Sequence, residues 1–197
     1  MPALDPVETT GAVLGFLYVL LAIRENAWCW PIGIANAALF LVVCGRARLY
    51  GAAGLQIVYL LVSFYGWYEW LHGGAQHGRL SVSRTPARWA AGLAVASAAG
   101  TLGLGLLLQH TDAALPFPDA AATALSLAAQ WMATRKWLEN WLVWMVVNVT
   151  NVGICLSQHL YAMALLYAAF LVLAVLGYKE WRTSAALEAG VELREKA

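Results

Sequence analysis

Seven apolar stretches, separated by short polar segments, occupy most of this chain between residues 9 and 181. A helix needs about 20 predominantly apolar residues to cross the hydrocarbon core of a bilayer, and most of these stretches come close to that length. The chain is 61% hydrophobic and only 12% charged. We therefore predict an all-α integral membrane protein with seven transmembrane helices, at approximately residues 9–23, 28–44, 50–71, 89–108, 119–133, 138–157 and 161–178.

The basic residues are divided unevenly between the two sides of this topology. One side carries only Arg46 and Arg48, whereas the other carries Arg24, Arg79, Arg84, Arg88, Arg135, Lys136, Lys179, Arg182, Arg194 and Lys196. Because cytoplasmic loops are enriched in Lys and Arg, we expect a multi-pass protein of the bacterial inner membrane with a periplasmic N-terminus and a cytoplasmic C-terminus. Asp5 and Glu8 precede the first span where a cleavable signal peptide would be basic, so we expect this span to be retained.

The sequence offers no pattern typical of an enzyme, a metal site or a nucleic-acid binder. It has no Walker, HExxH or GxSxG motif, and its net charge is only +1. Cys29, Cys44 and Cys155 lack metal-ligand spacing. We expect no catalytic activity, metal or cofactor, and leave open whether Cys44 and Cys155, both near outer span ends, form a disulfide.

Two pairs of similar segments indicate an internal duplication. Residues 25–30 (ENAWCW) lead into the second span and match residues 139–144 (ENWLVW), 114 positions later. Residues 66–70 (GWYEW) close the third span and match residues 177–181 (GYKEW), 111 positions later. Interfacial anchors would explain a single match by chance, but not ordered matches along both halves of the chain.

We interpret the change of offset as a deletion in the loop at 45–48, because a Leu-Tyr pair at 49–50 recurs at 160–161. The repeats are then spans one to three and five to seven, with one helix between them, so they run in parallel. This 3+1+3 arrangement divides the chain into a first three-helix repeat (1–75), a linker helix with flanking loops (76–116), a second three-helix repeat (117–182) and a cytoplasmic tail (183–197).

The motifs of both halves resemble the nicotinamide riboside transporter family, PnuC. They cover roughly residues 8–182 and comprise 30–36 (WPIGIAN), 49–50, 55–56, 65–70 (YGWYEW), 134–144 (TRKWLENWLVW), Asn148 and 160–163 (LYAM). The resemblance implies an architecture related to SWEET sugar transporters, a homotrimer, and facilitated diffusion of a vitamin precursor that is then trapped inside by phosphorylation. It also implies a small-molecule substrate, with nicotinamide riboside first and thiamine or another flat vitamin as the alternative.

Polar residues at mid-depth in the spans are the candidates for a substrate site, because an unpartnered polar group in the bilayer is costly. The candidates are Asn36 on the second span, Gln56 and Tyr59 on the third, and Trp141, Trp144, Asn148 and Asn151 on one stripe of the sixth. Aromatic faces hold a flat cation, and amides pair with a carboxamide and with hydroxyls. We expect Asn36 and Asn148 to face each other; the alternative role for such amides is to join helices.

The residues near the span ends suggest a different role. Trp67, Trp70 and Trp181 are expected to be interfacial anchors. No Asp, Glu, Lys or Arg falls at mid-depth, and proton-driven carriers generally use such a group, which favours facilitated diffusion. A membrane sensor or scaffold that does not transport remains an alternative, although it would not need the polar stripe.

Overall fold

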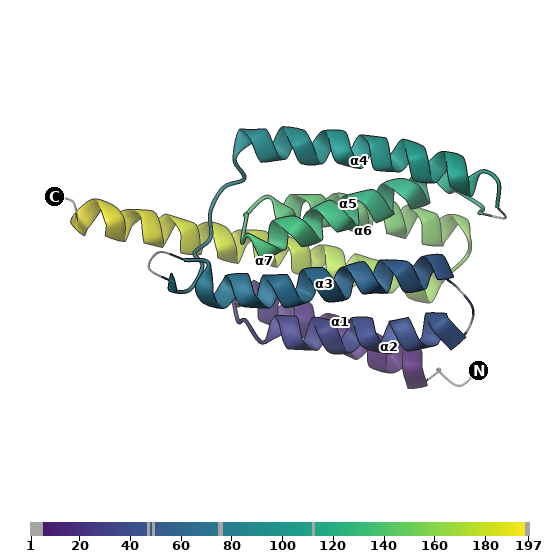
Figure 1. Cartoon of the computed structure of the whole chain (residues 1–197), viewed down its shortest axis with the longest axis horizontal. Helices are drawn as coiled ribbons and strands as arrows, with labels where there is room; N and C mark the ends of the chain where they lie inside the picture. The colour runs from purple at the N-terminus through teal and green to yellow at the C-terminus, as the bar shows by residue number, and fades with distance from the viewer. Residues whose placement is uncertain (1–5, 47, 49, 75–76, 112, 196–197) are drawn as a thin grey trace. The chain divides into compact units, whose positions relative to one another are not determined.

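The computed structural model describes residues 6–46, 48, 50–74, 77–111 and 113–195 (Figure 1). These residues form seven α-helices, which confirms the prediction of an all-helical chain. The helices are α1 (Pro6–Ile23), α2 (Cys29–Arg46), α3 (Tyr50–His72), α4 (Ala87–Leu108), α5 (Pro116–Thr134), α6 (Asn140–Ser157) and α7 (Tyr161–Glu195). Each predicted span coincides with one of them to within a few residues, except at the end of α7.

Four of these helices are long and apolar enough to cross a bilayer: α2, α4, α6, and α7 over Tyr161–Leu187. Within α1, the apolar part covers the shorter segment Thr9–Ile23. The helices α3 and α5 do not meet this criterion in the described residues, since each carries several polar side chains along its length. The fold is thus that of a multi-pass helical membrane protein.

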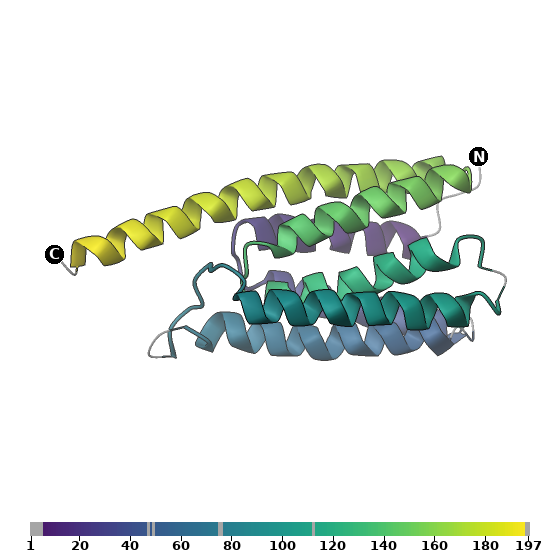
Figure 2. The same cartoon turned by 90° about the horizontal axis from the view of Figure 1, so that it is seen from above.

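The predicted end of the last span is not the end of its helix. We predicted a span ending at residue 178 and a separate tail from 183, but α7 continues to Glu195. Apolar character marks where a helix leaves the lipid, whereas the segment beyond Trp181 is rich in Ala, Leu and Glu, which are strong helix formers. Figure 2 shows α7 extending well past the end of α6, beside which it packs.

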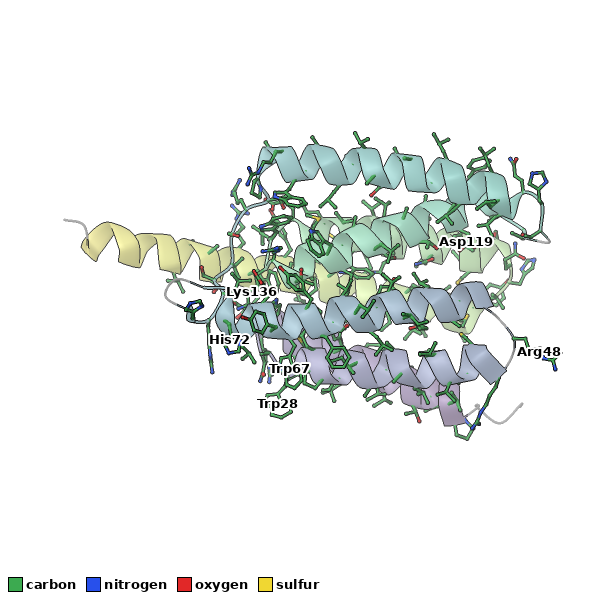
Figure 3. The ribbon with its side chains drawn as sticks, viewed as in Figure 1. Trp28, Arg48, Trp67, His72, Asp119 and Lys136 are labelled. Atoms are coloured by element: carbon green, nitrogen blue, oxygen red, sulfur yellow. The ribbon has the colours of Figure 1, made fainter. Side chains whose placement is uncertain are left out.

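The chain forms two compact units, Met1–Ser81 and Val82–Ala197. In the first unit α2 packs against both α1 and α3. Figure 3 shows Trp28, Trp67 and His72 at one end of this unit and Arg48 at the other. In the second unit α4 packs against α5, α5 against α6, and α6 against α7.

Among the described residues, four helices are followed, two positions after their last residue, by a residue in the left-handed conformation. None of these four residues is a glycine. Glu25 (φ 53°) and Lys136 (φ 48°) follow α1 and α5, and Arg48 (φ 58°) and His159 (φ 59°) follow α2 and α6. A left-handed residue lets the next amides bond back to the last carbonyls, as the Asn26 and Trp137 amides do to Leu21 and Met132. The sequence gives no Gly to mark these helix ends.

Candidate functional site

The first unit contains a tightly packed tryptophan pair at one end of α2 and α3. Trp30, which is fully buried, meets Trp70 edge to face, with ring centroids 5.5 Å apart and planes at 89°. Gly66 makes room for the Trp30 ring, since a Cβ at Gly66 would lie 2.5 Å from it. Trp70 is 2% exposed. It therefore belongs to the core of the unit, and its predicted role as an interfacial anchor is wrong.

The second unit repeats this arrangement with different residues. Trp141 meets Trp181 with ring centroids 5.3 Å apart and planes at 85°, and a Cβ at Gly177 would lie 2.6 Å from the Trp141 ring. Trp181 is 1% exposed, so it too is a core residue rather than an anchor. The indole N–H groups of Trp30 and Trp141 are both buried without a hydrogen-bond partner in the described chain.

These matching contacts follow a different register from that of our sequence comparison, which paired Trp30 with Trp144. In their contacts, Trp30 resembles Trp141. The helices α2 and α6 contain 18 residues each. Their first residues, Cys29 and Asn140, are as far apart in the sequence as Gly66 and Gly177 are, and so are their last residues, Arg46 and Ser157. No deletion in the loop at 45–48 is needed. With this spacing Asn36 aligns with Val147, and Asn148 aligns with Ala37.

In the first unit, Asn36 lies where α2 meets α1. Its side-chain oxygen Oδ1 is buried without a hydrogen-bond partner in the described chain, 3.6 Å from where a Cβ on Gly11 would be. The ring of Phe40, one turn further along α2, fills the space over Gly11. A buried amide oxygen with no partner costs free energy, which makes this position a candidate for binding a donor from outside the chain.

The other candidates of the first unit lie on α3. Gln56 and Tyr59 are both half-buried, and Tyr59 has a partner within the chain. Ser63, on the same stripe, is buried next to α2, with its hydroxyl 3.8 Å from where a Cβ on Gly33 would be. Gly33 also packs against the ring of Tyr18 from α1. Ser63 thus belongs to the contact between helices, whereas Gln56 and Tyr59 are only half-buried.

In the second unit the candidates follow one stripe of α6. Asn148 is 6% exposed, and its Nδ2 donates to the Trp144 carbonyl at 2.8 Å. This is the one hydrogen bond of the Asn148 amide within the described residues, so its oxygen and its second N–H are available to another molecule. Trp144 and Asn151 are half-buried, whereas Trp141 is enclosed by Gly177 and Trp181. Trp144 therefore has the aromatic face more open to a ligand.

A set of contacts that the sequence did not suggest fixes the start of α4. The carboxylate of Glu139 accepts hydrogen bonds from the Thr85 amide at 2.7 Å and from the Thr85 hydroxyl at 2.8 Å. Next to it, the Ser83 amide donates to the Lys136 carbonyl, and the Leu138 amide donates to the Ser83 carbonyl. These bonds join segments more than fifty residues apart. The segment 136–139 before α6 therefore holds the start of α4 against the α5–α6 turn.

The side chains at these positions are amides and aromatic rings, which suit the recognition of a small molecule. The described residues contain no group of three or more His, Cys, Asp or Glu that could hold a metal ion. Cys29, Cys44 and Cys155 are buried and form no disulfide in the described chain. What the stripes of α2, α3 and α6 offer is amides and aromatic faces set in apolar helices.

The sequence of the chain matches the family model of the nicotinamide mononucleotide transporter over residues 5–183. The chain belongs to this family. The resemblance noted in the sequence motifs is thereby confirmed, and the family is one of transporters. Its match covers every helix from α1 to α6 and most of α7.

Individual relatives agree with the family assignment. The chain is 29% identical to the nicotinamide riboside transporter PnuC of Escherichia coli strain K12, with 91% of this chain and 86% of that protein covered. It is 28% identical to the riboflavin/roseoflavin transporter RibM of Streptomyces davaonensis, over 88% and 83% of the two chains.

A solved structure shares the fold. The crystal structure of the vitamin B3 transporter PnuC superimposes with a TM-score of 0.69, covering 90% of this chain and 80% of that one, at 24% identity. At that identity the likeness concerns the arrangement of helices rather than the site.

Proposed function

We propose that this protein carries nicotinamide riboside across the bacterial inner membrane. The observation that supports this most strongly is the family match along nearly the whole chain, together with relatives named as nicotinamide riboside transporters at up to 29% identity. The site chemistry agrees, because the substrate combines a flat cationic ring with a carboxamide and ribose hydroxyls. We expect the protein to act as a transporter and not as an enzyme.

For the substrate site we propose Asn148 and Trp144 as the principal contacts, with Asn36, Gln56, Tyr59 and Asn151 as further contacts and Trp141 as a residue that positions α6. Asn148 has a free amide oxygen and N–H beside the half-buried face of Trp144. An amide can pair with the substrate's carboxamide, and an indole face can attract its cationic ring by about 0.5–2 kcal/mol. In this proposal the enclosed Trp141 orients the start of α6 rather than stacking on the substrate.

The matching of α2 with α6 and of the two tryptophan pairs supports a duplicated architecture. We propose that α1–α3 and α5–α7 are parallel repeats joined by the linker helix α4, in the 3+1+3 arrangement shared with SWEET transporters. The left-handed residues after α1 and α5, and after α2 and α6, recur at the same spacing as the tryptophans. We further propose, from the family resemblance, that the protein assembles as a homotrimer.

The proposed mechanism is facilitated diffusion followed by phosphorylation inside the cell. No Asp, Glu, Lys or Arg lies in the middle of a predicted span, so the chain lacks the side chain by which proton-coupled carriers sense a gradient. Phosphorylation by a separate kinase would then retain the product, because a phosphorylated nucleoside requires a cationic partner that these spans do not supply.

The riboflavin transporter among the relatives makes another flat vitamin the second candidate. Titrating purified protein with nicotinamide riboside, thiamine and riboflavin while following tryptophan fluorescence separates the candidates. We expect saturable quenching with nicotinamide riboside at concentrations at least tenfold below those needed for the other two. Tighter binding of thiamine or riboflavin would transfer the assignment to that vitamin, and no response to any of the three would favour a sensor or scaffold.

The distribution of charge supports the proposed orientation, with the N-terminus in the periplasm and the C-terminus in the cytoplasm. In the second unit one end gathers basic residues from α4, from the α5–α6 turn and from α7, namely Arg84, Arg88, Arg135, Lys136, Lys179 and Arg182. The connections at the other end, residues 109–115 and 158–160, contain no Lys or Arg. This asymmetry is what the positive-inside rule requires of a cytoplasmic end.

Reporter fusions provide the test of orientation. A fluorescent reporter after Ala197 should be active in the cytoplasm, and a phosphatase placed before Met1 should be active in the periplasm. A C-terminal reporter that is active only in the periplasm would reverse the proposed topology.

A further inference from the structure

The basic end of the second unit contains an organised cluster of arginine and tryptophan side chains. The Arg135 guanidinium lies over the Trp131 ring, 5.5 Å from its centroid. Trp89, near the start of α4, packs against Trp131 at 6.4 Å and against Trp137 at 5.8 Å. The three rings therefore join the start of α4 to the end of α5 and the turn that follows it.

Two further arginines belong to the same corner. Arg84 precedes α4 and Arg88 lies in its first turn, and both are exposed. The hydrogen bonds between Ser83 and the segment at 136–138 bring this part of the chain to the α5–α6 turn, which contains Arg135 (Figure 3 labels the neighbouring Lys136). Neither Arg84 nor Arg88 has an ion-pair partner among the described residues.

The Glu139 carboxylate in this corner is already engaged. Glu139 accepts two hydrogen bonds from Thr85, and it has no ion-pair partner in the described chain. The corner thus combines positive charge with aromatic rings that are held in place by packing. Guanidinium groups match the geometry of phosphate oxygens, and tryptophan rings are typical of the membrane interface.

We propose that Arg84, Arg88 and Arg135 bind the phosphate of an anionic phospholipid, with its acyl chains lying along α4. The helix provides the surface for those chains, because Val95, Leu102 and Leu106 are exposed along its length. A soluble phosphate would gain nothing from this apolar face. Basic pockets at the cytoplasmic ends of spans are known to bind anionic headgroups, which is the chemistry that this corner presents.

Native mass spectrometry of the full-length protein in detergent, during titration with phosphatidylglycerol or phosphatidylcholine, tests the proposal. We expect bound phosphatidylglycerol on the wild type, and about thirtyfold weaker binding by the double variant Arg84→Gln/Arg88→Gln, from the loss of two charges near the surface. Lys179→Gln/Arg182→Gln is the matched control, since it removes two charges from α7 at the same end of the unit. It should retain nearly all of the lipid binding.

Retention of binding by the arginine variant, or an equal loss in the control, would overturn the proposed site. Equal binding of phosphatidylcholine would show that charge does not select the lipid, which also contradicts the proposal. Displacement of the lipid by millimolar inorganic phosphate would assign the corner to soluble phosphate instead. Size-exclusion profiles of both variants report whether they are folded, and Arg84→Lys/Arg88→Lys should restore part of the binding if the loss is electrostatic.

Discussion

Replacing Asn148 with leucine should weaken nicotinamide riboside binding roughly hundredfold or more, because each substrate group left unpaired in a buried site costs about 1–3 kcal/mol. Asn148 is positioned by the bond from its Nδ2 to the Trp144 carbonyl, which leaves its oxygen and second N–H for the substrate. Leucine has a similar volume and a high helix propensity, so α6 should stay intact. Fluorescence titration and size-exclusion chromatography of the purified variant measure the two effects separately.

A second substitution on α6 tests whether removing any polar side chain from this helix weakens substrate binding. The Thr150 hydroxyl donates to the Val146 carbonyl, within the helix itself, and is not among the proposed substrate contacts. Thr150→Val should therefore bind the substrate as the wild type does. Binding of wild-type strength by Asn148→Leu would show that Asn148 serves only to join helices, and a similar loss in both variants would point to a disturbed helix.

Adding a single methyl group at Gly66 or Gly177 should destabilise the folded protein by about 1–3 kcal/mol, the usual cost of overpacking a core. The new Cβ would lie 2.5 Å from the Trp30 ring at Gly66 and 2.6 Å from the Trp141 ring at Gly177. Neither indole can retreat easily, because each is buried and packed edge to face against a second tryptophan. Thermal unfolding in detergent should show a midpoint several degrees lower for each variant.

Two other helical glycines supply matched controls for this effect. A Cβ on Gly92 of α4 or on Gly153 of α6 would have nothing within 4 Å. Gly→Ala at these positions should leave the midpoint unchanged or raise it, since alanine is favoured in a helix by up to about 1 kcal/mol. Destabilisation at Gly92 and Gly153 equal to that at Gly66 and Gly177 would contradict the role of the tryptophan pairs.

The hydrophobic pattern predicted the helices well because span length and apolar content follow directly from the bilayer. The spacing between the similar contacts of the two units was harder to predict. The sequence aligned ENAWCW with ENWLVW, yet Trp30 and Trp141 are the residues with matching contacts. Glu and Asn at this turn do not occupy equivalent positions in the two units: Lys136 is the left-handed residue that corresponds to Glu25. Identical residue types in the two halves were therefore a poorer guide to this spacing than the contacts of the side chains.

The burial of individual tryptophans could not be predicted from the sequence pattern. Trp141 and Trp144 are three positions apart on one helix, but only Trp144 keeps a partly open face, because Gly177 admits the other ring into the core. Trp70 and Trp181 lie near span ends, where anchors are common, and are nevertheless buried. The role of each tryptophan depends on which glycine or ring opposes it, and those partners lie tens of residues away in the chain.

Transport of nicotinamide riboside by facilitated diffusion is tested most directly in proteoliposomes that contain the purified protein and equal concentrations of the labelled substrate on both sides. With no Asp, Glu, Lys or Arg in the middle of a predicted span, the proposed carrier lacks the kind of side chain through which a proton gradient usually biases substrate movement. We predict that exchange of the label is rapid, and that imposing a proton or sodium gradient produces no net accumulation. Sustained accumulation that collapses with the gradient would contradict facilitated diffusion, and absence of exchange by a folded protein would contradict transport of this substrate.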